Sequence, residues 1–113
     1  MCKKCSVISS LFDVAGDNPH INYMPTVMFL QGMEKNEVIE LYAGDCLLRD
    51  TLNVLYEEKH YTVCHYLRCK ECSKVFQLGA CIRGTPIYKQ IDIINKDHID
   101  KLLWGNQGTM FMI

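Results

Sequence analysis

Two Cys-x-x-Cys pairs, Cys2 with Cys5 and Cys69 with Cys72, carry the clearest chemistry in this sequence. A closed structural zinc site takes four ligands in a tetrahedron, and two pairs of thiolates supply such a set. The tight turn within each pair directs both sulfurs toward one ion. The spacing therefore predicts one zinc ion bound by Cys2, Cys5, Cys69 and Cys72, which would tie the start of the chain to its middle.

The pattern resembles zinc-ribbon and zinc-knuckle sites in general, but three further cysteines compete as ligands. If Cys69–Cys72 closes a hairpin, Cys64 faces Gln77 about 15 Å from the turn, and Cys81 faces His60 about 30 Å from it. A ligand set that mixes Cys64, His65 or Cys81 with the turn remains an alternative, and so does a protein without metal. The remaining cysteine, Cys46, is expected on an apolar helical stripe, as a small core residue.

Other chemistry of paired cysteines fits this sequence less well. An iron–sulfur cluster also takes four thiolates, but the symmetric spacing of the two pairs favours zinc. A thioredoxin-like motif needs its cysteines at the start of a helix, whereas Cys69–Cys72 is expected between strands.

We expect no enzymatic activity, because four thiolates close the zinc shell and leave no open position for a substrate. The sequence also lacks His-Glu-x-x-His, a glycine-rich phosphate loop and Gly-x-Ser-x-Gly. Cys64 or Cys81 with a histidine base is the catalytic alternative, and inert buried cysteine is the commoner outcome.

The chain has 113 residues, which predicts one zinc-stabilised domain over residues 1–113. No apolar run reaches the roughly 20 residues that span a bilayer, so no membrane association is expected. The first residues do not have the layout of a signal peptide. Seven cysteines cannot all pair as disulfides, and these features together predict a cytoplasmic protein.

The elements that must position the cysteines follow from periodicity and turn residues. The segment Val7–Val14 fits either a strand or a short helical turn, and Ala15–His20 is rich in turn formers. Elsewhere we expect strands at Tyr23–Leu30 (an edge strand, because of Pro25), His60–Arg68, Lys74–Ile82, Ile87–Ile94 and Thr109–Ile113.

The main helical region is expected over Glu34–Lys59, where apolar residues recur every three or four positions. Gly44 and Asp45 would divide it, with Asp45 capping the second helix. A short helix capped by Asn95 or Asp97 should run to Trp104. The expected fold class is α+β: an antiparallel sheet with a zinc-ribbon-like four-cysteine hairpin, packed against two or three helices.

The net charge of −1 hides an uneven distribution, because acidic residues gather in the expected helical region and basic residues in the second half. We therefore expect a protein partner, as for an inhibitor, immunity or adaptor protein, bound through Glu37, Glu40 and Asp50. Nucleic-acid binding by a basic hairpin over residues 66–89 is the alternative, since its cations alternate with aromatic residues.

Overall fold

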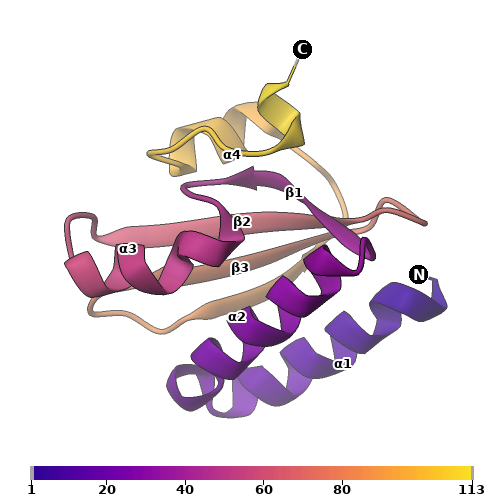
Figure 1. Ribbon diagram of the computed structural model, residues 1–113, viewed down its shortest axis with the longest axis horizontal. Helices are drawn as coiled ribbons and strands as arrows, with labels where there is room; N and C mark the ends of the chain where they lie inside the picture. Colours follow the sequence, from indigo (N-terminus) through magenta and orange to yellow (C-terminus); the bar gives the residue numbers. More distant parts are fainter. Residues whose placement is uncertain (1, 113) are drawn as a thin grey trace.

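The computed structural model describes residues 2–112 and places their strands in one antiparallel sheet, in the order β1-β2-β3-β4. The strands are β1 (Ile39–Gly44), β2 (Thr62–Cys69), β3 (Val75–Cys81) and β4 (Ile87–Ile91). Helices α1 (Lys3–Asp17) and α2 (Pro19–Lys35) lie side by side over one face (Figure 1). Helix α4 (Lys96–Leu102) lies on the other face, and α3 (Thr51–Glu57) lies near one end of the sheet. The expected α+β class is confirmed.

Side chains alternate along the strands, and each face of the sheet carries a core. The larger core lies between the sheet and the helices α1 and α2, where Phe12 packs edge-on against Phe76 and Tyr88. The smaller core lies between the sheet and residues 96–112, which we call the C-terminal segment. This segment includes α4 and the 3₁₀ turn η2 (Thr109–Phe111). The members of the smaller core are Tyr42, Ala43, Cys64, Tyr66, Val75 and Ile99. The C-terminal segment thus gives β1 and β2 a second covering layer.

The hairpin of β2 and β3 is present, but its register differs by two residues from the expected one. Cys64 lies opposite Gly79 rather than Gln77, and Cys81 lies opposite Thr62 rather than His60. The cause is a longer turn, because the N–H of Cys69 donates to the carbonyl of Lys74 and closes a loop of four residues between them. Ser73 in this loop adopts a left-handed backbone with φ 66°.

The expected edge strand at Tyr23–Leu30 is wrong, because this segment belongs to helix α2. Tyr23, Thr26, Val27 and Leu30 are buried at helical spacing, so packing on the sheet outweighs their β-propensity. Pro25 lies on the exposed side of the helix. The expected loop at Ala15–His20 shrinks to a break at Asn18, and the segment Val7–Val14 is helical as part of α1.

The long helical region at Glu34–Lys59 is also wrong. Helix α2 ends at Lys35, β1 pairs with β2, and after the 3₁₀ turn η1 (Leu48–Asp50) helix α3 spans Thr51–Glu57. Asp45 caps no helix here.

At the C-terminal side, the Asn95 cap is confirmed, since its side chain accepts a hydrogen bond from the N–H of His98 at 3.0 Å. The expected last strand is the turn η2 instead, and Ile113 of that prediction lies outside the described residues. Within residues 2–112, no helix combines the length and the apolar character needed to cross a membrane.

Candidate metal centre

The four predicted cysteine ligands meet at one place in the structure. Cys2 precedes the first turn of α1 and Cys5 lies within it, while Cys69 ends β2 and Cys72 lies in the following turn. Their four sulfurs all lie within 4.8 Å of one another. The cluster therefore joins the start of the first helix to the tip of the central hairpin.

The sulfur separations fit a single tetrahedral ion. The Sγ of Cys2 lies 3.5 Å from those of Cys5 and Cys69, and the Sγ of Cys5 lies 3.3 Å from that of Cys72. A tetrahedron with metal–sulfur bonds of about 2.3 Å has sulfur–sulfur edges of about 3.8 Å. All four cysteines are free thiols, and their separations exceed the roughly 2.05 Å of a disulfide. This four-cysteine cluster can hold a metal ion.

Local structure explains why the sulfurs converge. Cys2 and Cys5 are three positions apart, so the two lie on the same side of the first helical turn. Cys69 points to the same face of the sheet as Leu67 and is fully buried, as is Cys5. The N–H of Lys70 donates to the carbonyl of Val38 at 3.0 Å, which holds the hairpin tip against the start of β1.

The protonation of the cluster differs from one sulfur to the next. The backbone N–H groups of Cys2 and Lys74 lower the pKa of the exposed Cys72 thiol to about 6. Burial raises the pKa of Cys5 to about 12, with the thiols of Cys72 and Cys2 adding to the rise. Metal binding must remove the proton from Cys5, whereas Cys72 is the sulfur most ready to bind as thiolate.

The other cysteines lie outside this cluster. Cys46 follows β1 and is half-buried, so it does not lie on the expected helical stripe. Its Sγ is 3.6 Å from Nε2 of His65. Among residues 2–112, this is the hydrogen-bond contact that joins a thiol to an imidazole nitrogen. Cys64 accepts a hydrogen bond from the Gln77 side chain at 3.4 Å.

Cys46 and His65 have the residue types of a nucleophile and its base, but not the protonation states. The carbonyl of Cys46 lies 3.1 Å from Nε2 of His65 and can only accept, so Nε2 carries the proton. Burial lowers the pKa of His65 to about 4 and raises that of Cys46 to about 11. At neutral pH the thiol is therefore protonated, and the nitrogen beside it has no lone pair to receive a proton.

Asp45 connects three parts of the fold by hydrogen bonds, a role that the sequence did not predict. Its carboxylate is buried and accepts the N–H of Cys64 at 2.7 Å, of Trp104 at 2.7 Å and of Gly105 at 3.1 Å. These bonds join the end of β1, the central strand β2 and the C-terminal segment. No local sequence pattern marks such a residue, because its three partners come from distant parts of the chain.

The three acidic residues predicted to bind a partner do not share a helical face. Glu37 is exposed in the loop after α2, Asp50 is half-buried in η1, and Glu40 lies on β1. Both Nε and Nη2 of Arg68 donate to Oε1 of Glu40, at 2.9 and 2.7 Å. A partner role for these three residues stays a prediction.

No family model matches this chain, and no curated protein or solved structure matches it. The fold and the site together define an α+β protein with a four-cysteine cluster at the junction of its first helix and its central hairpin.

Proposed function

We propose that this chain is a small cytoplasmic protein without enzymatic activity, which binds one zinc ion as a structural staple and acts by binding another protein. An inhibitor, immunity or adaptor role fits this description. The separations and all-sulfur composition of the cluster support zinc, because a closed four-thiolate shell is typical of structural zinc sites. An iron–sulfur cluster is less suitable, since it distributes its four thiolates over two or four irons and so holds them further apart than a single ion does.

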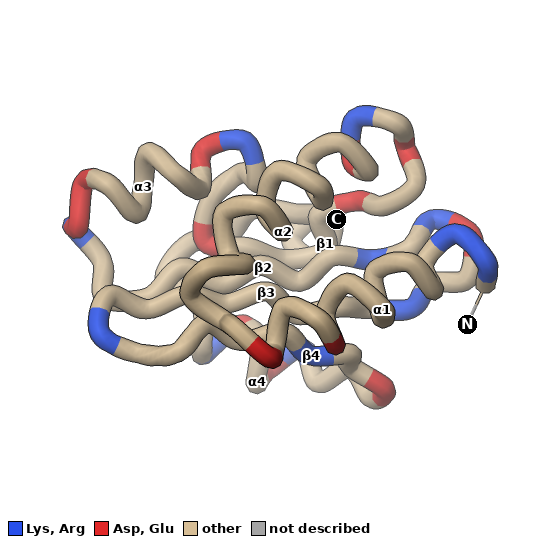
Figure 2. Tube along the Cα trace, turned by 90° about the horizontal axis from the view of Figure 1, so that it is seen from below, with Lys and Arg blue, Asp and Glu red and all other residues tan. Residues whose placement is uncertain are grey.

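The observation that carries the protein-binding proposal is the outer surface of α2. Residues 18–33 include no Asp, Glu, Lys or Arg, and in Figure 2, which looks onto the α1 and α2 layer, α2 is uncharged along most of its length. Ile21, Met24 and Met28 have relative exposures of 76%, 55% and 60%. A surface helix normally has a polar outer face, whereas a helix that is apolar all round is usually buried.

Neighbouring residues extend this apolar surface. Val7 and Val14 on α1 are exposed and lie two helical turns apart. On the other side, a groove of about 540 Å³ separates α2 from α3 and is lined by His20, Tyr23, Met24, Leu52, Asn53, Leu55 and Tyr56. We call the outer surface of α1 and α2, together with this groove, the α2 face.

The chemistry of the α2 face suits a protein partner. Six exposed apolar side chains of α1 and α2 (Val7, Val14, Ile21, Met24, Met28 and Phe29) offer on the order of 600 Å², near the 800 Å² that each side of a standard interface buries. Methionine adapts its shape to different neighbours, and tyrosine is enriched at interfaces. Burying this surface would stabilise a complex through the hydrophobic effect.

The test is capture of partners from cells that naturally make the protein, with mass spectrometry of what is retained. The double variant Met24→Lys, Met28→Lys should lose the partner while keeping its metal and its melting temperature, because both side chains face solvent. The matched comparison is Glu37→Lys, Glu40→Lys, Asp50→Lys, which tests the acidic residues. Unchanged capture by the methionine variant would contradict a role for the α2 face.

Nucleic-acid binding by the basic hairpin over residues 66–89 is less favoured by the structure. Two of its cations already have carboxylate partners, Arg68 with Glu40 and Lys74 with Asp92. Binding of nucleic acid that falls steeply with added salt and disappears in Lys70→Glu, Arg83→Glu would overturn the protein-binding proposal.

A further inference from the structure

The sheet face opposite α1 and α2 is only partly covered. The C-terminal segment packs over β1 and β2, where Ile99 contacts the smaller core. Over β3 and β4 the same face carries Gln77, Gly79, Ile87 and Lys89, of which only Gly79 is buried. Gly79 lies in the middle of this uncovered part and, as a glycine, has no side chain to fill the space there.

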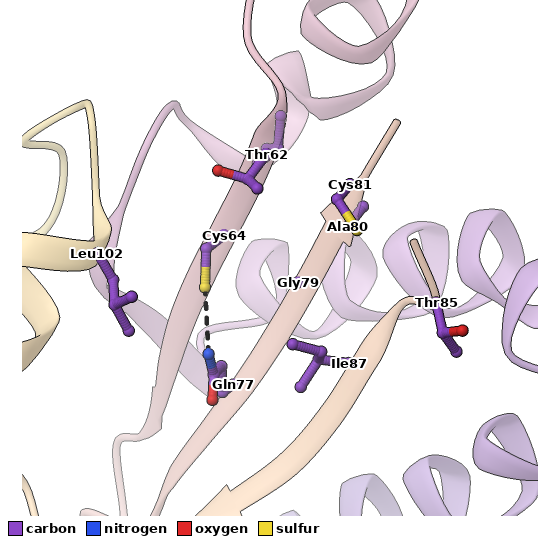
Figure 3. A pocket seen from close by; sticks show the side chains of 10 residues that line it. Thr62, Cys64, Gln77, Gly79, Ala80, Cys81, Thr85, Ile87 and Leu102 are labelled. Atoms are coloured by element: carbon purple, nitrogen blue, oxygen red, sulfur yellow. Dashed lines mark hydrogen bonds between the residues drawn. The ribbon is translucent and has the colours of Figure 1, made fainter. Parts of the chain in front are cut away.

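A hollow of about 170 Å³ opens at Gly79. Figure 3 shows Cys64 and Gln77 on neighbouring strands, with Ile87 beside them on β4 and Leu102 on the α4 side. A Cβ built on Gly79 would lie 3.6 Å from Ile87 and 3.8 Å from Cys64, both ordinary contact distances. The walls are mainly apolar, and a dry apolar cavity of about 150 Å³ is large enough to bind benzene.

A second hollow of about 350 Å³ adjoins the first and shares Gln77, Ile87 and Leu102 with it. Its remaining wall is formed by Tyr66, Lys89, Ile91, Ile93, Asn95, His98 and Ile99. Together the two hollows, which we call the channel, reach the size of typical small-molecule sites, which is about 300–1,000 Å³. The Gln77 side chain lies between them, with one N–H directed to the Cys64 sulfur.

Among the described residues that line the two hollows, the Lys, Arg, Asp and Glu side chains amount to one cation and no carboxylate. Lys89 lines the second hollow, and no Asp or Glu among the described residues lines either hollow. Within residues 2–112, the ion pairs of the structure do not include Lys89. A cation at one end of an apolar channel is complementary to an anion with an apolar tail.

The strand register sets the length of such a ligand. Lys89 pairs with Gln77, Ile87 with Gly79, and Cys81 with Thr62, so Lys89 and Cys81 stand two rows apart on this face. Two rows of side chains span about 14 Å along the strands. We propose that this channel binds a small amphipathic carboxylate, such as a medium-chain fatty acid, with its tail in the hollow at Gly79 and its carboxylate at Lys89.

The experiment is a titration of the zinc-loaded protein with octanoate, followed by amide chemical shifts, with 1-octanol as the uncharged comparison. Octanoate should give saturable shifts at residues of β3 and β4 and bind more tightly than 1-octanol. Lys89→Gln should weaken octanoate about tenfold, the size expected for loss of one charge-assisted hydrogen bond. The control Lys101→Gln removes an exposed cation of α4 that lines neither hollow, and it should change nothing.

Two wall variants test the place of the tail. Gly79→Leu should fill the hollow and abolish binding, and its melting temperature and zinc content show whether it folds. Ile87→Asp, on the exposed edge strand β4, sets a carboxylate beside the channel and should weaken octanoate more than its uncharged counterpart Ile87→Asn. The proposal is overturned if octanoate gives no saturable shifts, if 1-octanol binds equally well, or if octanoate binds undiminished to folded Gly79→Leu and to Ile87→Asp. None of these outcomes depends on the α2 face.

Discussion

The Sγ of Cys5 on α1 and the Sγ of Cys72 in the β2–β3 turn lie 3.3 Å apart, although the two residues are 67 positions apart in the chain. This contact links the first turn of the first helix to the tip of the central hairpin. Cys5 is buried within the larger core, whereas Cys72 is exposed. A metal ion at this point would therefore stabilise the docking of α1 at the boundary between the core and the solvent.

The first prediction concerns the ligands. Cys72→Ser should reduce bound zinc from one ion per chain to well below that, because an alcohol is a poor replacement for a thiolate in a closed four-sulfur site. Elemental analysis of protein prepared with zinc present gives the stoichiometry. Cys81→Ser is the matched control, since Cys81 lies outside the cluster, and it should keep the full zinc content. Equal zinc in both variants would exclude Cys72 as a ligand.

The second prediction concerns stability after metal removal. Structural zinc contributes on the order of 10 kcal/mol in small zinc-dependent peptides, and less where a core forms without it. Chelation should lower the melting temperature and increase amide exchange first in α1, because its N-cap residue Cys2 and its first-turn residue Cys5 supply two of the four sulfurs. Exchange in β2 and β3 away from the turn serves as the internal reference. A melting curve that does not move after verified removal of metal would show that the ion is dispensable for the fold.

The third prediction concerns pH and His65. Burial lowers the pKa of this imidazole to about 4, below the ordinary value of 6.5. The unfolded chain therefore binds the proton first, and the stability that neutral His65 provides is complete above pH 6.5 and is lost as pH falls toward 4. The loss amounts to roughly 3 kcal/mol.

Urea unfolding of the wild type and of His65→Gln at several pH values measures this effect. Stability of the wild type should fall more steeply between pH 6.5 and 4 than that of the variant. Protonation of the cysteine cluster affects both proteins alike, so it cancels in the difference between their slopes. Parallel curves would mean that His65 titrates normally in the folded protein.

The fourth prediction concerns Asp45, which accepts three backbone N–H groups. Asp45→Ala should destabilise the protein by about 2–4 kcal/mol, because it leaves the buried N–H of Cys64 and the partly buried N–H groups of Trp104 and Gly105 without an acceptor. Amide exchange should rise at Trp104 and Gly105 as the C-terminal segment loosens. Asp100→Ala removes an exposed carboxylate of α4 and should change stability by less than about 0.5 kcal/mol. Similar losses in both variants would show that the Asp45 bonds contribute little.

Features that a short stretch of the sequence encodes were predictable. The spacing of the cysteine pairs identified the four members of the cluster, and the structure brings them within 4.8 Å. The turn at Cys69–Ser73 between two strands follows from a local pattern, and so does the Asn95 cap of α4. In each case the information lies within a few residues, where turn geometry and capping act.

Residues whose conformation depends on distant contacts were not predictable. Tyr23–Leu30 looks like a strand by composition, yet the sheet beneath it buries one helical face and makes it a helix. Ile39–Gly44 has helical spacing, yet pairing with β2 makes it a strand. Asp45 collects its three donors from β2 and the C-terminal segment. The sequence by itself determined the four thiols that could hold a metal ion and the local turns. Burial and strand pairing, which act between residues far apart in the chain, decided the elements around them.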